Sequence, residues 1–379
     1  MLEFIARAPF KIGDRIINKG EALCLSAPQA SVIAQKGYLL EKGIIGLNDV
    51  VAAYETRVRV LVEKLENPPE QASKKAMRYV VSLLIRYESL KTISPPSTGF
   101  LEEVAEFNQT AIGINPISKI QSDKGAGEWA GYNCNIGTGC PHGCLYCYAE
   151  RMATRFNRVD SSFEWLEEFL RAVNSAKCKK YSEPIMFPTT HDITEGYLRP
   201  YRCHLYNILN AGNVVILVTK PHRESIEAIC SEFSSFRDNM IFRFSIGTLD
   251  NATLNLWEPG APSLSERMWC LQYAFEQGFR TSVSAEPMLT DRHGAERLYY
   301  TVEPFVTEDI WFGKMNNVGG FRKSENADIA CSASELVAAY QDSEIMAQVE
   351  HMGALPKVSW KDSVKDVIKK HNNRNEDKI

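Results

Sequence analysis

The sequence predicts an α/β protein built on a parallel sheet. Between about residues 130 and 320, short runs rich in β-branched and aromatic residues alternate with segments whose apolar residues recur every three to four positions. Strands that alternate with helices are typical of βα units, in which a helix connects two parallel strands. Polar side chains also follow directly after the apolar runs. A binding site at the carboxyl ends of parallel strands would produce this pattern.

Six strands and three helices are predicted in this core. The strands cover residues 133–136, 185–187, 214–219, 241–246, 281–285 and 310–312, and the helices cover residues 198–210, 223–233 and 263–277. The last helix has the clearest boundaries. Ser263 and Glu266 form an S-x-x-E capping box at its start, and Gly278 stands where a C-terminal cap belongs.

Three further parts are expected around the core, which is predicted to span residues 101–325. Residues 1–46 hold short apolar runs broken by glycines, which indicates a small N-terminal module. Residues 47–100 are predicted to form two amphipathic helices, at 50–66 and 72–90, followed by a linker. Residues 326–379 are predicted to form a C-terminal helical extension, with helices at 332–352 and 358–370 and a solvated tail.

Length and composition limit the class of protein. The 379 residues are 44% hydrophobic and 24% charged, which are ordinary values for a globular chain. The net charge of −4 gives no overall attraction for nucleic acid, so a basic surface would have to be local. The sequence has neither a long uncharged apolar stretch nor the pattern of a secretion signal. We therefore expect a cytoplasmic protein with no membrane partner.

Three of the ten cysteines form one tight cluster, Cys140, Cys144 and Cys147, spaced C-x3-C-x2-C. Thiolates at this spacing can surround a soft metal centre, and three of them leave one iron of a [4Fe-4S] cube without a protein ligand. The spacing also permits free thiols, a disulfide, or a zinc site completed by Cys134, His142 or a distant cysteine. The scattered cysteines are predicted to be mostly small buried hydrophobes.

The run C-P-H-G-C-L-Y-C-Y resembles the cluster loop of the radical S-adenosylmethionine (SAM) superfamily, and is most similar to its spore photoproduct lyase branch. The continuation C-Y-A-E-R is similar to an uncharacterised phage-associated radical SAM family. The resemblance implies a partial (β/α)6 barrel, matching the six predicted strands, in which the three cysteines hold a [4Fe-4S] cluster. It implies an enzyme that cleaves SAM reductively to a 5′-deoxyadenosyl radical, which abstracts hydrogen from a substrate. A one-electron donor such as flavodoxin or ferredoxin would be its partner.

The resemblance also assigns three contacts to SAM. Tyr146 takes the aromatic position that usually meets the adenine, and Lys220 resembles a lysine that faces the carboxylate at the end of a strand. Ser245 matches a serine placed near the ribose. Plain packing is the alternative for Tyr146, and an ordinary position on the rim of the site is the alternative for Lys220 and Ser245.

One motif of the superfamily is missing. Many members carry Gly-Gly-Glu after the second strand to bind the amino group of SAM, whereas this chain has M-F-P-T-T-H-D. Thr189, Thr190 and Asp192 are the candidates to replace it. His191 is interpreted as a hydrogen-bonded residue rather than as a ligand or a base.

Glu258 and Glu286 are further candidates for polar contacts to SAM or substrate, because W-E-P-G-A-P and S-A-E-P-M-L are also similar to the lyase-like branch. The sequence identifies no catalytic residue. The resemblance favours a nucleic-acid base or nucleotide as substrate, and the weak overall charge keeps a peptide or small molecule as the alternative. The rival hypothesis is a binding protein that holds zinc or a cluster on the same barrel without turnover.

Overall fold

The computed structural model describes residues 74–376 and five short strands that precede them. These strands are β1 (Leu2–Ala6), β2 (Phe10–Ile12), β3 (Arg15–Ile17), β4 (Ala22–Leu25) and β5 (Leu40–Glu41). β4, β1 and β5 form a three-stranded antiparallel sheet, and β2 pairs with β3. The predicted helix at 50–66 lies outside the described residues. The second predicted helix of that segment is confirmed as α3 (Lys74–Lys91).

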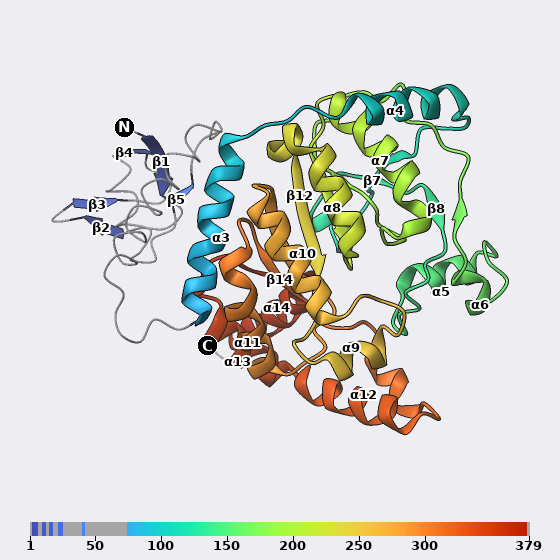
Figure 1. Ribbon diagram of the computed structural model, residues 1–379. Helices are drawn as coiled ribbons and strands as arrows, with labels where there is room; N and C mark the ends of the chain where they lie inside the picture. Colours follow the sequence, from blue (N-terminus) through green and yellow to red (C-terminus); the bar gives the residue numbers. More distant parts are fainter. Residues whose placement is uncertain are drawn as a thin grey trace. The chain divides into compact units, whose positions relative to one another are not determined.

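The chain forms two compact units. One contains Met1–Ile93 with Glu276–Gly278, and the other contains Ser94–Phe275 with Phe279–Ile379. The second unit carries the predicted core, of which Figure 1 labels β7, β12 and β14. It is built on an eight-stranded sheet in the order β15-β14-β13-β12-β11-β10-β7-β6. Its strands are β6 (Ile117–Lys119), β7 (Tyr132–Cys134), β10 (Ile185–Met186), β11 (Val215–Thr219), β12 (Met240–Ser245), β13 (Arg280–Ala285), β14 (Ile310–Phe312) and β15 (Val358–Trp360).

The predicted α/β class is confirmed by the pairing of these strands. All six predicted strands are present, as β7 and β10 to β14, and each pairs in parallel with the next along the chain. β15 continues the parallel sheet beyond β14, and β6 is antiparallel at the opposite edge. Strands that follow one another in chain order across a parallel sheet have the connectivity of a partial (β/α) barrel.

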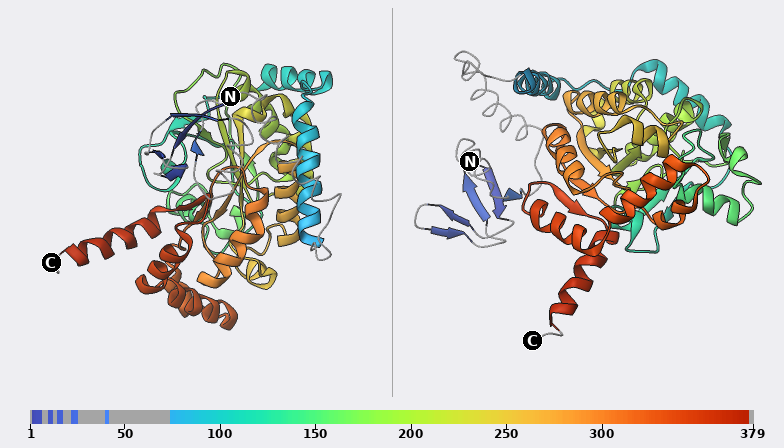
Figure 2. Two further views of the ribbon diagram at one scale, coloured as in Figure 1. Left: turned by 90° about the vertical axis from the view of Figure 1, so that its left-hand side faces the viewer. Right: turned by 90° about the horizontal axis from the view of Figure 1, so that it is seen from below.

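The helices of the second unit lie before, between and after these strands. They are α4 (Thr98–Thr110), α5 (Tyr148–Arg155), α6 (Ser162–Trp165), α7 (Glu195–Asn210), α8 (Arg223–Glu232), α9 (Asn251–Trp257), α10 (Leu264–Glu276), α11 (Arg292–Val302), α12 (Ala327–Ala339), α13 (Asp342–Met352) and α14 (Asp362–Glu376). The shorter elements are β8 (Gly137–Thr138), β9 (Phe169–Leu170) and the 3-10 helices η1 (Gly125–Glu128), η2 (Ser234–Asn239), η3 (Glu303–Phe305) and η4 (Val318–Lys323). α7, α8, α10 and α11 lie along the outer side of the core sheet (Figure 2). No described helix is both long and apolar enough to cross a membrane.

The central strands are buried on both faces, which explains their nearly continuous apolar sequences. In β11 and β12 most side chains are inaccessible to solvent, as in parallel sheets covered by helices. Arg243 of β12 is the one charged residue in these two strands, and it is also buried, at 4% exposed. Its Nε donates to Oγ of Ser282 at 2.9 Å, and its guanidinium carbon lies 4.5 Å from the ring centre of Trp129 and 5.5 Å from that of Trp311. The inner face of the sheet therefore contains charge paired with aromatic rings.

The predicted capping box of α10 is half confirmed. Oγ of Ser263 accepts the N–H of Glu266 at 3.3 Å, and Gly278 has the expected left-handed conformation, with φ of 86°. The reciprocal bond of the box is replaced, because the Glu266 carboxylate accepts the N–H of Arg223 at 2.9 Å instead. Glu266 thus links the starts of α8 and α10.

The predicted helix at 358–370 is wrong in its first three residues. Val358–Trp360 form strand β15, and α14 begins only at Asp362. The Trp360 ring lies 5.8 Å from that of Phe312 on β14, so tertiary packing fixes this short segment as a strand. Lys361 follows β15 and is fully buried, with Nζ 2.8 Å from Oε2 of Glu128 and 2.6 Å from the carbonyl oxygen of Gly125. The predicted C-terminal extension therefore contributes a strand to the core sheet.

Gly313 at the end of β14 provides a test of this packing. A Cβ atom there would lie 2.9 Å from both Cβ and Cγ of Lys361 and 3.1 Å from Cγ of Glu286. We expect Gly313→Ala to lower the free energy of unfolding by about 1–3 kcal/mol, because the stem of Lys361 cannot move aside without loss of its buried contacts. Chemical denaturation measures the change. Gly320→Ala, where a Cβ meets no atom within 4 Å, is the control, and an equal effect of both substitutions would contradict the expectation.

Candidate functional site

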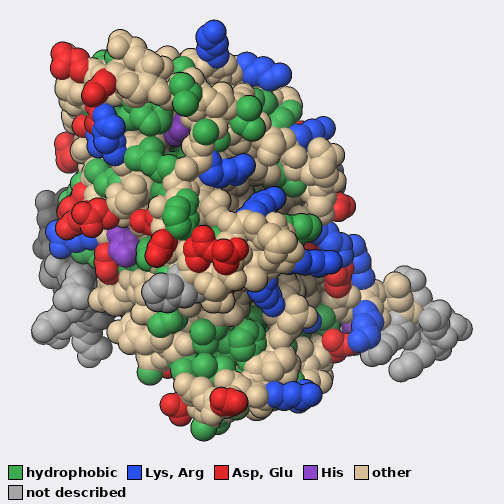
Figure 3. Space-filling model, turned by 90° about the vertical axis from the view of Figure 1, so that its right-hand side faces the viewer, with side chains coloured by type: hydrophobic (Ala, Val, Ile, Leu, Met, Phe, Trp, Pro, Cys, Tyr) green, Lys and Arg blue, Asp and Glu red, His purple; other side chains and the backbone are tan. Residues whose placement is uncertain are grey.

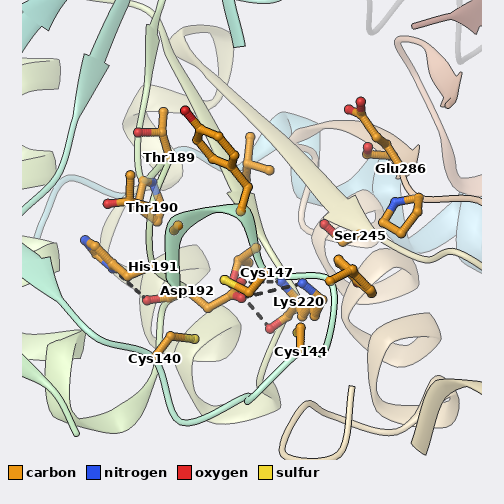
Figure 4. Close-up of a pocket in the computed structure, with 18 of the residues that line it drawn as sticks. Cys140, Cys144, Cys147, Thr189, Thr190, His191, Asp192, Lys220, Ser245 and Glu286 are labelled. Carbon is orange, nitrogen blue, oxygen red and sulfur yellow. Dashed lines mark hydrogen bonds and ion pairs between the residues drawn. The ribbon is translucent and has the colours of Figure 1, made fainter. Parts of the chain in front are cut away.

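The carboxyl ends of the parallel strands open into one cavity of about 310 Å³. Its lining contains every cofactor and metal residue predicted from the sequence: Cys140, Cys144, Tyr146, Cys147, Thr190, Asp192, Lys220, Ser245 and Glu286. Figure 4 shows the three cysteines and Lys220 close together, with Ser245 and Glu286 across the cavity from Cys140 and His191. Residues that are far apart in the sequence therefore meet because each follows a strand of the same sheet.

The cysteine loop runs from β8 to the start of α5. Cys147 is the N-cap residue of α5, and its Sγ accepts the N–H of Glu150 at 3.4 Å. Cys140 and Cys144 are 6% and 7% exposed. Burial raises the pKa of the Cys140 thiol and raises that of Cys144 to about 12, so both thiols are protonated in the protein alone at neutral pH. A bound metal centre would have to displace these protons, as thiolate ligation requires.

Two glycines give the loop its sharp turns. Gly139 and Gly143 have φ of 97° and 56°, a region that residues with a Cβ atom rarely adopt. At Gly139 a Cβ would also lie 1.7 Å from the carbonyl oxygen of Glu167. The backbone can therefore turn twice within a few residues and direct its cysteines into the cavity.

Asp192 anchors the loop to β11. Its Oδ2 lies 3.0 Å from Nδ1 of His142, the buried histidine between the first two cysteines. Its Oδ1 accepts the hydroxyl of Thr219 at 2.7 Å and the backbone N–H of Lys220 at 2.6 Å. Burial would raise the pKa of Asp192, but Lys220 and His142 outweigh it and hold the pKa well below its usual range. Asp192 is therefore an ionised group whose two oxygens already have partners.

This geometry distinguishes between the residues that were predicted from the sequence to replace the Gly-Gly-Glu motif. Asp192 has little remaining capacity to accept a further hydrogen bond. Thr190 also lines the cavity, and its hydroxyl has no hydrogen bond to another described residue. The arrangement therefore favours Thr190 for direct contact with a ligand and Asp192 for holding His142 and Lys220 in place.

Lys220 places a buried cation beside the cysteines. Its Nζ lies 3.8 Å from Oδ2 of Asp192 and 5.8 Å from the ring centre of Tyr146. Burial alone would lower the pKa of Lys220, but Cys144 and Tyr146, which are negative only when deprotonated, and the ionised Asp192 hold it well above the usual value. The ammonium group therefore stays charged and is suited to a carboxylate ligand.

Tyr146 lines the cavity and contacts a buried acid that lies outside the cavity lining. Its hydroxyl donates to Oε1 of Glu258, which is 3% exposed and forms an ion pair with the buried Arg267. Glu258 does not line the cavity. The direct contact to SAM or substrate predicted for Glu258 is therefore not what the structure shows, because the ring of Tyr146 takes that place on the wall.

Asn135 is a site residue that the sequence did not reveal. It follows β7 and is 7% exposed. Its Oδ1 accepts the N–H groups of Thr189 and Thr190 at 2.8 and 2.9 Å, and its Nδ2 donates to Oγ1 of Thr189 at 2.6 Å. The predicted strand at 133–136 included Asn135, whereas β7 ends at Cys134, so no signal in the sequence assigned this side chain to the site. His191 is a hydrogen-bonded residue as predicted: its Nε2 accepts the N–H of Ile136 at 3.3 Å, and burial lowers its pKa to about 4.

Glu286 lies on the wall of the cavity opposite Cys140. Its side chain is 26% exposed, and Oε2 lies 3.4 Å from Nζ of the buried Lys361. Burial raises the pKa of Glu286 to about 7, although Lys361 partly opposes the shift. Trp129 lines the same cavity, with the Lys361 ammonium 4.0 Å from its ring centre. Neither Trp129 nor Lys361 was predicted, because Trp129 lies in no recognisable pattern and Lys361 lies in a stretch that was predicted to be an exposed helix.

One group of three metal-binding side chains has its ligand atoms within 4.8 Å of one another in the described part of the chain: Cys140, His142 and Asp192. Both ring nitrogens of His142 already have partners, Asp192 at 3.0 Å and His222 at 2.8 Å. Cys134, the other nearby residue considered for zinc, is fully buried in the hydrophobic core of the sheet and does not line the cavity. These contacts disfavour a zinc site completed by either residue.

Comparison with known proteins gave few similarities in sequence. No model of a protein family matches the chain. The uncharacterised protein ORF301 of Acidianus two-tailed virus is 27% identical over 203 residues, which cover 49% of this chain and 67% of that protein.

Several solved structures are similar at low sequence identity. A spore photoproduct lyase mutant with dinucleoside spore photoproduct is 13% identical, with a TM-score of 0.42, and the match covers 71% of this chain and 86% of that chain. SuiB of Streptococcus suis bound to S-adenosylmethionine is 11% identical, with a TM-score of 0.37, over 86% of this chain and 68% of that chain.

The pKa of Glu286 predicts how stability depends on pH. The folded protein keeps a proton on this carboxyl up to about pH 7, whereas the unfolded chain releases it near the ordinary value of 4.5. The folded state therefore binds more protons between these values, and the free energy of unfolding falls as pH rises through this window. We expect Glu286→Gln to remove about 2–3 kcal/mol of that fall.

Chemical denaturation at pH 5 and pH 7.5 measures this effect. The exposed Glu325 provides the control, because Glu325→Gln removes a carboxylate outside the cavity. If Glu286→Gln and wild type lost the same stability between the two pH values, the raised pKa of Glu286 would be refuted.

Proposed function

We propose that the protein is a radical SAM enzyme that holds a [4Fe-4S] cluster on Cys140, Cys144 and Cys147. The observation that carries the proposal is the meeting of the three loop thiols and the Lys220 ammonium in one cavity at the carboxyl edge of a parallel sheet (Figure 4). The donor set fits the group, because sulfur ligands suit iron–sulfur clusters and three thiolates leave one position open. A buried cation beside that position suits the carboxylate of an amino acid.

When bound, such a cluster supplies one electron to the sulfonium of SAM, which breaks a carbon–sulfur bond and gives methionine and a 5′-deoxyadenosyl radical. Side chains of this protein would hold each part of SAM in position. Lys220 would bind the carboxylate of SAM, and Thr190 would accept a hydrogen bond from the amino group. The ring of Tyr146 would contact the adenine, and Ser245 would lie near the ribose. The reducing electron would come from a one-electron donor such as flavodoxin or ferredoxin.

The proposed substrate is a nucleic-acid base or nucleotide. Tyr148 and Arg151 line the cavity, and Tyr148 is 66% exposed. The exposed Phe156 follows at the end of α5, with the guanidinium carbon of Arg155 5.9 Å from its ring centre. Aromatic rings that stack on bases, interleaved with arginines that pair with phosphates, are typical of single-strand binding surfaces. The face seen in Figure 3 carries hydrophobic, basic and acidic side chains together. The exposed aromatic rings and arginines of α5 and its C-terminal end support the assignment despite the negative net charge.

Anaerobic reconstitution tests the cluster and its activity. We expect wild-type protein to bind about four iron and four sulfide ions per chain, and to form 5′-deoxyadenosine when SAM and dithionite are added. Cys144→Ala should abolish product formation, because it removes one ligand of the cluster. Cys134→Ala is the control, since Cys134 is a buried cysteine outside the cavity. Stoichiometric zinc in place of iron, or a loaded cluster with no SAM cleavage, would support the rival binding protein.

Binding of a single-stranded oligonucleotide tests the substrate class. We expect measurable affinity that falls as salt increases, because phosphate contacts release counterions. The double variant Arg151→Gln, Arg155→Gln should weaken binding and reduce the slope of log K against log salt by about 1–2. Arg322→Gln, Lys323→Gln on η4 is a control with the same loss of charge. Equal affinities of the two double variants would favour a peptide or small molecule as substrate.

A further inference from the structure

A continuous chain of buried polar contacts joins the cysteine loop to the end of β12. The hydroxyl of Tyr146 donates to one oxygen of Glu258, and the other oxygen lies 2.5 Å from Nη2 of Arg267. Nη1 of Arg267 then donates to the carbonyl oxygen of Ser245 at 3.1 Å. Both charged residues are buried, at 3% exposed for Glu258 and 1% for Arg267. The two ends of this chain, Tyr146 and Ser245, are the residues proposed to meet the adenosyl part of SAM.

The backbone around Glu258 is fitted to the same loop. The N–H of Leu145 donates to the carbonyl oxygen of Trp257 at 2.9 Å, and the N–H of Gly260 donates to that of His142 at 2.9 Å. A Cβ atom at Gly260 would lie 2.2 Å from the carbonyl oxygen of Pro141. The segment that carries Glu258 therefore runs directly against the loop that carries the cysteines, and backbone hydrogen bonds join the two.

A contribution to stability does not account for the ion pair by itself. Two buried charges lose their hydration, and well-packed apolar side chains often serve equally well or better at such positions. The polar contacts of Arg267 instead fix the orientation of its guanidinium group. The planar guanidinium of Arg267 is oriented by two hydrogen bonds, from Nη1 to the carbonyl oxygen of Ser245 and from Nε to that of Pro262 at 2.8 Å, and Glu258 lies beside it as the ion-pair partner. An apolar pair would fill the space without fixing these angles.

We infer that Glu258 and Arg267 are positioning residues for SAM, which hold the Tyr146 ring and the Ser245 end of β12 at a fixed separation before SAM binds. The inference rests on the proposed function. It differs from a direct contact, because neither charged side chain lines the cavity. Loss of the chain of contacts would leave the cysteines in place but let the two walls of the adenosyl site move independently, so that SAM has to order them on binding.

Tyr146→Phe is the most selective variant. It keeps the aromatic ring and the Glu258–Arg267 ion pair, and removes only the hydroxyl that connects them. Glu258→Gln breaks the chain at its centre. The matched control is Glu308→Gln, because Glu308 forms a two-point ion pair with Arg280 at 3.0 and 2.9 Å at the opposite end of β13. SAM binding is measured from the change that SAM produces in the electron paramagnetic resonance spectrum of the reduced cluster, titrated in each protein.

We expect Tyr146→Phe and Glu258→Gln each to raise the SAM concentration for half of the spectral change by about tenfold. Their iron content and the spectrum without SAM should match those of the wild type. The double variant should be little worse than the single ones, because both changes interrupt one chain of contacts. Glu308→Gln should stay close to wild type.

The inference is overturned if loaded Tyr146→Phe and Glu258→Gln bind SAM as the wild type does, or no more weakly than Glu308→Gln. If Glu258→Gln does not hold the cluster, Tyr146→Phe decides alone, because it leaves the buried ion pair intact. If wild-type protein holds a cluster that does not respond to SAM, the proposed function itself fails. The two failures are thus distinguishable.

Discussion

Asp192 receives hydrogen bonds from two directions, and the shape of the cavity depends on them. His142 reaches it from the cysteine loop, and Thr219 and Lys220 reach it from the end of β11. A carboxylate in this position is stable only with such partners, because burial of an unpaired charge is costly. Since the loop and the strand satisfy the same carboxylate, neither can shift without leaving a charge unpaired. The cysteines are thereby held at a fixed distance from the lysine that faces them.

Glu258 plays a comparable part on the other side of the loop, with Tyr146 and Arg267 as its partners. The loop is thus held by two acids at two places, one on each side of Cys144. Asp192 and Glu258 both lie outside the cysteine loop, so tertiary contacts rather than bonds within the loop hold it in place. Backbone bonds between the loop and Trp257 add to these contacts. A ligand would therefore meet walls that are already ordered, which reduces the cost of binding.

The sequence was sufficient to predict the sheet and the lining of the cavity, because both depend on local rules. Buried parallel strands are continuous apolar runs, and the residue after each run has to lie at the carboxyl edge. Lys220 and Glu286 directly follow such runs and Ser245 lies near the end of one, whereas their assignment as ligand contacts came from the resemblance to the radical SAM superfamily. Lys361 could not be found, because it stands among the surface lysines of a helical pattern and its partners Gly125 and Glu128 are more than 200 residues away. Local sequence does not record which of several lysines becomes buried.

Glu258 was predicted to touch the ligand for a related reason. Its neighbours in sequence resemble a functional motif, but whether a side chain faces a cavity or the back of its wall depends on the turn after α9, which the motif does not specify. Glu266 illustrates the same limit, because its carboxylate bonds to the start of α8 instead of closing its own capping box. For both glutamates the sequence indicated a polar contact, but it did not indicate which group the carboxylate would contact.

The position of β15 has a consequence for the order in which the protein is assembled during translation. The parallel strands appear on the ribosome in the order in which they pair, from β7 to β15, so each can be added to the growing edge of the sheet. Lys361 emerges last, although it pairs with Glu128 near the first of these strands and contacts Glu286 beside β14. Until it arrives, the carboxyl groups of Glu128 and Glu286 lack the cation that each of them contacts in the folded protein. The nascent chain can therefore build its strands early, but the charge balance of the cavity is completed only by its final strand.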